Sequence, residues 1–118
     1  MKDPNKIVSD HRRLLTILQE AAGERLAASY VSVFLAIAES GGAVSNGTLE
    51  RTLGMSAGAT SRAVQALSAL SWRKDERGFK VPGAGWLEEE RDPRDARNKA
   101  WRLSAAGERV YAKLKATP

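Results

Sequence analysis

The sequence contains no cysteine, one histidine and four prolines, and only 6% of its residues are aromatic. Without cysteine the chain can form neither a disulfide nor a thiolate metal site, and a reducing compartment suits it. No long uncharged apolar run is present, which excludes a membrane-spanning helix, and the polar first residues show no secretory signal. We therefore expect a cytoplasmic protein that does not bind membranes.

Residues suited to catalysis are also scarce. His11 has Leu14 and Leu15 where a second metal ligand would stand, so we expect a surface or interface residue. The sequence has no phosphate-binding glycine motif, and successive carboxylates in Glu88–Glu90 would alternate between the two faces of a strand. We predict neither an enzyme nor a cofactor or metal site.

The basic residues are unevenly distributed. The 118 residues, 42% hydrophobic and 28% charged, have the length and composition of one globular domain spanning residues 1–118. Residues 1–55 carry six basic and six acidic groups, whereas residues 56–118 carry thirteen and eight, so the whole formal excess of +5 lies there. Such asymmetry indicates a polyanionic partner, most simply nucleic acid.

Residues 45–70 have the pattern of a helix-turn-helix. Leu49 and Leu53 share one face of a short first helix, Gly54 suits a left-handed turn, and Ser56 can cap the second helix. The second helix is expected to bury Ala63, Val64, Leu67 and Leu70. Its outward face, which lacks acidic groups, is expected to contact the major groove through Ser56, Thr60, Ser61, Arg62 and Gln65.

Two helices are predicted before this pair. Residues 6–22 carry an apolar stripe that must lie on the core of the chain or on a second copy. We favour a homodimer interface formed by Ile7, Leu14, Leu15 and Leu18. Residues 24–40 are apolar most of the way round and are expected to form a central helix, which Gly41 and Gly42 terminate before a short strand at 43–44.

The second half predicts a β-wing and a last helix. Residues 71–85 extend the second helix or form a hairpin around 76–78, whereas 86–90 and 99–103 alternate as two strands of a wing spanning 86–103. Residues 91–98 are expected to form the turn. Glu88–Glu90 are a solvated strand face or partners of its arginines, and Ser104 caps a C-terminal helix within 104–116. The basic residues expected to reach the minor groove are Arg91, Arg94, Arg97 and Lys99.

These motifs resemble those of the MarR family of winged-helix transcriptional regulators. The resemblance is carried by residues 45–67, by Gly85–Glu88, by Asp92-Pro93-Arg94-Asp95-Ala96-Arg97, and by Leu103-Ser104 with Gly107. It implies a mainly α fold with a small β-wing, a homodimer formed by terminal helices, and recognition helices in successive major grooves. It further implies that Asp95 orients Arg97 within the wing.

The sequence departs from the family pattern in three places. Residues 71–84 are longer than the family's connection, Glu50 stands where a small residue is usual, and the last helix is short. Many family members bind small aromatic effectors, and such a pocket would involve Tyr30, Phe34 and Trp86, for which core packing is the favoured interpretation.

The sequence therefore predicts a winged helix-turn-helix protein that binds double-stranded DNA sequence-specifically. We expect a homodimeric repressor that reads an inverted repeat. The alternatives are a winged-helix module for protein interaction or replication, and an architectural protein that binds DNA without base-specific contacts.

Overall fold

The computed structural model describes residues 4–23, 26–68, 70–74, 76–92 and 95–116. The elements are, in order, α1 Pro4–Ala22, α2 Ala28–Ser40, β1 Val44–Ser45, α3 Asn46–Leu53, α4 Ala57–Leu67, β2 Leu70–Lys74, β3 Lys80–Pro82, β4 Leu87–Asp92, β5 Asp95–Leu103 and α5 Ala105–Ala116. The expectation of a mainly helical chain with a small β-wing is confirmed.

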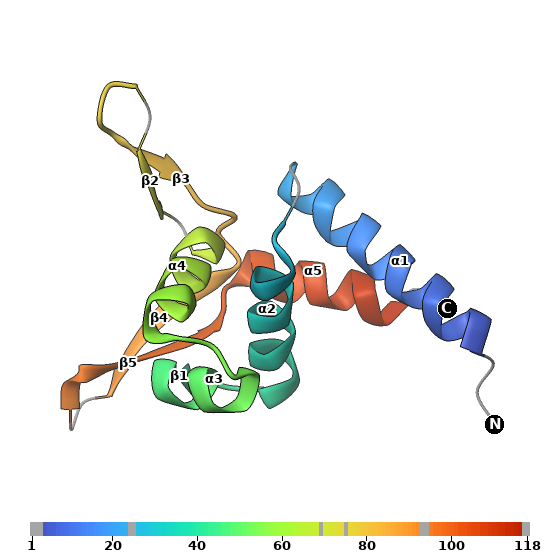
Figure 1. The fold of residues 1–118 in the computed structure, drawn as a ribbon, viewed down its shortest axis with the longest axis horizontal. Helices are drawn as coiled ribbons and strands as arrows, with labels where there is room; N and C mark the ends of the chain where they lie inside the picture. Colours follow the sequence, from blue (N-terminus) through green and yellow to red (C-terminus); the bar gives the residue numbers. More distant parts are fainter. Residues whose placement is uncertain (1–3, 24–25, 69, 75, 93–94, 117–118) are drawn as a thin grey trace.

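Two separate β-sheets extend from the helices within the described ranges. The three-stranded sheet has the order β1-β5-β4 and is antiparallel throughout, whereas β2 and β3 form a second, two-stranded sheet. Both hairpins project from the side of the molecule that carries α4, in different directions, while α1 and α5 lie side by side on the other side (Figure 1). The wing is therefore β4–β5, and β2–β3 is an additional hairpin between it and α4.

The core lies where α2, α4 and the base of the wing meet. Helix α2 contributes Val33, Phe34 and Ile37, which are almost completely buried, in agreement with the central position expected from its apolar sequence. The Phe34 and Trp86 rings pack at a centroid distance of 5.1 Å and an interplanar angle of 57°. The remaining buried hydrophobic residues of this cluster are Leu18, Val31, Leu49, Ala63, Val64, Leu67, Leu87, Trp101 and Val110.

The helix-turn-helix forms where the sequence predicts it. The Ser45 hydroxyl accepts from the Thr48 amide at the start of α3, and the Ser56 hydroxyl accepts from the Ala59 amide at the start of α4. Gly54 ends α3 with φ of 65° and ψ of 34°, a left-handed conformation that costs other residues free energy. Ser104 likewise caps α5, because its hydroxyl accepts from the Gly107 amide.

Several predicted boundaries are wrong. Helix α4 ends at Leu67 rather than Leu70, because Ser68 is extended with φ of −88° and ψ of −172°, and Leu70 begins β2 instead. Helix α2 begins at Ala28 rather than at residue 24, after an extended Ala27.

Other boundaries change the interpretation of the two hairpins. The hairpin alternative for residues 71–85 is the correct one, since β2 pairs with β3. The predicted wing turn is too long, because the β4–β5 ladder continues through Arg91↔Lys99 to Asp92↔Asp95.

None of the helices in the described residues combines the length and the apolar composition that a membrane span requires.

Candidate nucleic-acid interface

The outer face of α4 is small, polar and basic. Ser56, Gly58 and Arg62 are exposed, and Ser61 and Gln65 are half-buried. The Gln65 side-chain amide donates to the Ser61 hydroxyl at 3.1 Å, one helical turn apart. Arg62 is thus the cation of this face. A guanidinium can donate two hydrogen bonds to a guanine edge or bind a phosphate.

Thr60 does not belong to this face, so its assignment to the DNA-contacting set is a wrong prediction. The residue is completely buried because it lies on the same helical stripe as Ala63, Val64 and Leu67, which form the inner face of α4. Its hydroxyl has no hydrogen-bond partner among the described residues. The sequence interpretation followed the polarity of the side chain, whereas helical periodicity places it inside.

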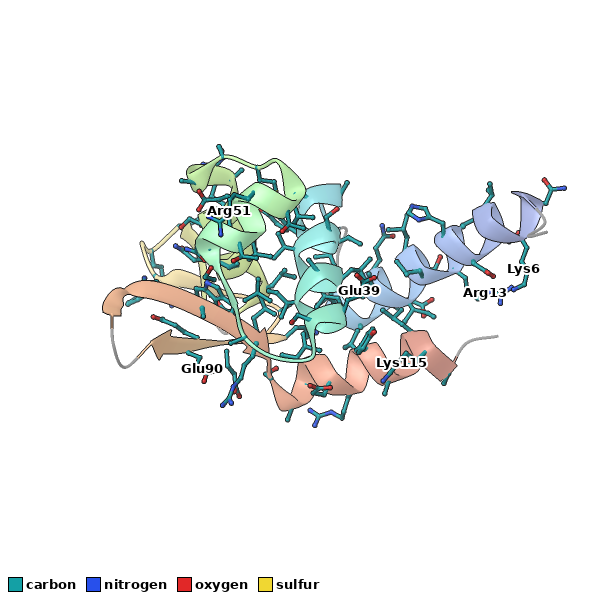
Figure 2. All side chains as sticks on the ribbon, turned by 90° about the horizontal axis from the view of Figure 1, so that it is seen from below. Lys6, Arg13, Glu39, Arg51, Glu90 and Lys115 are labelled. Carbon is teal, nitrogen blue, oxygen red and sulfur yellow. The ribbon has the colours of Figure 1, made fainter. Side chains whose placement is uncertain are left out.

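Helix α3 adds a cation that the sequence interpretation missed. Arg51 is exposed, and its guanidinium donates to the Thr48 hydroxyl at 3.4 Å. In Figure 2 it lies on α3 on the opposite side of the molecule from Lys115 of α5. From Arg51 to Lys74 the sequence has no acidic residue, so α4 and the end of α3 form a continuous segment without carboxylates. This gap between acidic residues is visible in the sequence, and it could have been used to assign Arg51 to the same surface as α4.

The wing is fixed to the helix-turn-helix at its base. The indole nitrogen of Trp101 donates to the Asn46 side-chain oxygen at 2.7 Å, and β1 pairs with β5 through Val44↔Trp101 and Ser45↔Ala100. Trp101 is itself buried. These contacts tie β5 to the start of α3, so the wing keeps a defined position beside α4.

Of the four predicted basic wing residues, only Lys99 has a described side chain, and it is exposed on β5. Arg94 lies outside the described residues, as do the side chains of Arg91 and Arg97, although Arg91 and Arg97 lie within β4 and β5. Their contact with DNA stays a prediction, as does the pairing of Asp95 with Arg97.

The three glutamates of β4 are exposed, as expected for a solvated strand face. Glu88 also pairs with Arg102, which stands opposite it in the β4–β5 register. The Arg102 guanidinium donates to the Glu88 carboxylate at 3.2 Å. The partner of Glu88 thus comes from the returning strand near the wing base rather than from the arginines of residues 91–97.

The C-terminal end of α4 is held by the residues that follow the β2–β3 hairpin. The amides of Ala84, Gly85 and Trp86 donate to the carbonyl oxygens of Ala66, Ser68 and Leu67 at 2.9, 3.0 and 2.7 Å. Gly83 allows this approach, because a Cβ there would overlap the Ser68 carbonyl oxygen and lie 2.8 Å from that of Ala66. We call residues 83–86 the α4 clamp. Through it, the base of the hairpin and the last turn of α4 form one unit.

The predicted dimer residues divide into two groups. Leu18 is completely buried in the core of its own chain, so its assignment to an interface with a second copy is wrong. Leu14 and Leu15 are half-buried and pack against the same core. Towards the start of α1, Val8 is 69% exposed and His11 is exposed, while the Ile7 side chain lies outside the described residues. The first half of α1 therefore leaves an apolar residue uncovered in a single chain.

The aromatic residues considered for an effector pocket belong to the core. Phe34 and Trp86 are buried against each other, and Tyr30 packs at the edge of the same cluster. A separate pocket of about 330 Å³ lies between the end of α2, β4–β5 and the start of α5. Its charged lining consists of Glu88, Glu90, Arg102 and Glu108, and no described residue of α3 or α4 lines it.

Comparison with known proteins finds similarity in structure alone. No protein-family profile matches the chain, and no curated protein matches its sequence. A mutant MarR from E. coli solved with operator DNA is 18% identical, with a TM-score of 0.57 over 93% of this chain and 69% of that chain. The MarR family transcription regulator SP03579 is 16% identical, with a TM-score of 0.62 over 96% of this chain and 64% of that chain.

Further regulators give the same result. A probable transcriptional regulator from Pseudomonas aeruginosa is 21% identical, with a TM-score of 0.58 over 98% of this chain and 76% of that chain. PcaV from Streptomyces coelicolor, solved with its natural ligand, is 20% identical and has a TM-score of 0.57, with coverage of 97% and 71%. The chain thus spans roughly two thirds to three quarters of these proteins, and it has the winged-helix fold of the MarR-type transcriptional regulators.

Proposed function

We propose that this chain is a transcriptional regulator that binds double-stranded DNA sequence-specifically, with α4 as its recognition helix. The observation that carries this proposal is the outer face of α4, where Arg62 is exposed between small polar residues and no carboxylate is present. A helix of this kind can enter the major groove, because neither bulk nor negative charge opposes its approach to base edges.

The surrounding structure supports this role. The N-terminal amides of α4 and the exposed Ser56 suit a phosphate contact. The wing is held beside α4 through Trp101 and Asn46, and its sequence offers Arg91, Arg94, Arg97 and Lys99 to the neighbouring minor groove. Operator DNA bound to the MarR mutant of similar fold agrees with this use of the fold.

We further propose that the regulator is a homodimeric repressor that reads an inverted repeat. The exposed Val8, in the first half of α1, supports a second copy of this chain as its cover. The half-sites would then lie about one helical turn, roughly 34 Å, apart. Sedimentation equilibrium of the chain tests the dimer, and selection of bound duplexes from a random pool tests the repeat.

Arg62→Ala tests the recognition role directly. If Arg62 reads a base, the variant should lose about 1–3 kcal/mol of binding free energy and relax its preference at one base position. Mobility-shift titrations against the selected duplex and a scrambled duplex measure both effects. Equal losses on the two duplexes would reduce Arg62 to a phosphate contact.

A matched control keeps this test specific. Arg109→Ala removes the same charge from the exposed surface of α5, away from α4, and should leave both titrations unchanged. If the wild-type chain binds no duplex at near-physiological salt, the DNA-binding proposal fails and a winged-helix interaction module replaces it.

A further inference from the structure

The β2–β3 hairpin is the largest feature that the proposed function leaves unexplained. In the sequence it lies between α4 and the wing. In space it projects beyond the C-terminal end of α4 and points away from the wing (Figure 1). The α4 clamp holds its base through three backbone hydrogen bonds to the last turn of α4. The base of the hairpin is therefore tied to the last turn of α4.

The charges of the hairpin favour an anionic partner. Residues 70–82 contain four basic residues, Arg73, Lys74, Arg77 and Lys80, against two acidic ones, Asp75 and Glu76. In the β2–β3 register Lys74 stands directly opposite Lys80. Like charges at opposed positions destabilise a strand pair, and an anion that binds both would remove that repulsion.

The length of α4 bears on where this hairpin would lie if α4 enters the major groove. Its 11 residues extend about 16 Å at about 1.5 Å per residue, whereas the major groove is about 12 Å wide. A recognition helix that crosses the groove thus reaches the edge of the groove near its last turn. The residues that follow the last turn would then lie against sugar and phosphate rather than base edges. Here the continuation is β2–β3, and its exposed tip carries Arg77 and Phe79, the latter 67% exposed.

We propose that the β2–β3 hairpin is a second wing, which binds the phosphate backbone at the edge of the major groove opposite the β4–β5 wing. This inference rests on the proposed function, because it requires α4 to enter the groove. The second wing contributes affinity that does not depend on base sequence, through Lys74 and Lys80 at the opposed positions and the basic residues around them. It also extends the length of duplex that each chain covers.

The test is the salt dependence of DNA binding by Lys74→Ala/Lys80→Ala. The slope of log Kd against log salt should fall in magnitude by about 1.8, since each phosphate contact contributes about 0.9. The affinity loss should be the same on specific and scrambled duplexes, and hydroxyl-radical footprints should shorten at one edge of each half-site. Lys74→Arg/Lys80→Arg keeps both charges and should restore the wild-type slope.

Lys113→Ala/Lys115→Ala is the control, because it removes the same charge from α5, on the other side of the molecule from Arg51 (Figure 2). A slope for the hairpin variant equal to that of wild type or of this control would overturn the second wing. Unchanged circular dichroism and melting temperature exclude misfolding as a cause of any loss. Failure of the proposed function gives a different result, in which wild type itself binds no duplex.

Discussion

The two hairpins of this chain are attached to the helices in different ways. The wing, β4–β5, joins a three-stranded sheet, buries Leu87 and Trp101 in the core, and contacts α3 through a side-chain hydrogen bond. The β2–β3 hairpin forms its own sheet, has an irregular register, and is held at its base by backbone hydrogen bonds to α4. The wing is positioned by side-chain packing and by strand pairing with β1, whereas the β2–β3 hairpin is held by a close backbone approach that only glycine permits at residue 83.

This difference predicts that the two attachments respond to different substitutions. The α4 clamp should be sensitive to any added volume at Gly83, whatever its chemistry. The wing base should be sensitive to the loss of one polar partner. Gly83→Ala tests the clamp, Trp101→Phe tests the wing base, and Thr60→Val tests α4, which both hairpins flank.

Gly83→Ala should have the largest effect. The new Cβ would overlap the Ser68 carbonyl oxygen, so the clamp must move away from α4 and its three hydrogen bonds must lengthen. We expect a loss of about 1–3 kcal/mol in the free energy of unfolding, the range typical of overpacking, measured by urea denaturation. Gly42→Ala is the matched control, because nothing lies within 4 Å of its Cβ. Equal stability of the two variants would show that the clamp is loose.

Trp101→Phe should have an intermediate effect. It keeps an aromatic ring at the wing base but removes the donor to Asn46, whose side-chain oxygen then loses its partner. We expect a loss of about 1–2 kcal/mol in the free energy of unfolding. DNA affinity should fall as well, because the wing is less firmly placed. A double-mutant cycle with Asn46→Ala isolates the hydrogen bond, and strict additivity of the two variants would contradict this assignment.

Thr60→Val should have the smallest effect, and in the opposite direction. It removes a buried hydroxyl that has no hydrogen-bond partner in the part of the chain that the structure describes, and it keeps the branched shape of the side chain. We expect the free energy of unfolding to increase by about 1 kcal/mol. DNA affinity should not change, since Thr60 lies on the inner face of α4. A substantial loss of affinity in mobility-shift titrations would restore Thr60 to the contact surface.

Local patterns in the sequence were sufficient for most of the fold. The Ser56 cap, the Gly54 turn and the apolar stripe of α4 are signals within a few residues of one another, so the helix-turn-helix could be predicted closely. The end of α4 could not, because it depends on amides from residues 84–86 that arrive only after the hairpin has formed. Distant backbone contacts of this kind leave no periodic signal.

The predictions for the candidate site were likewise correct in part. Arg62 followed from helical spacing, and its exposure is confirmed. Thr60 was misplaced because residue type was given more weight than its position on the buried stripe. Leu18 was assigned to a dimer because the stripe of α1 does not reveal which chain covers it. In the structure Leu14, Leu15 and Leu18 pack on the core of their own chain, whereas Val8, earlier in α1, is exposed.

The way in which β2–β3 begins and ends has a consequence for how this fold can vary. Leu70 and Pro82 are paired neighbours, and the chain then returns to the last turn of α4 before β4 begins. The wing therefore starts from the same point in space however many residues the hairpin contains. Loop closure costs only about 0.6 kcal/mol for each doubling of length, so insertions and deletions at its tip are thermodynamically mild. Changes in hairpin length can thus alter the reach of the proposed second wing along a duplex while the spacing between α4 and the β4–β5 wing stays constant.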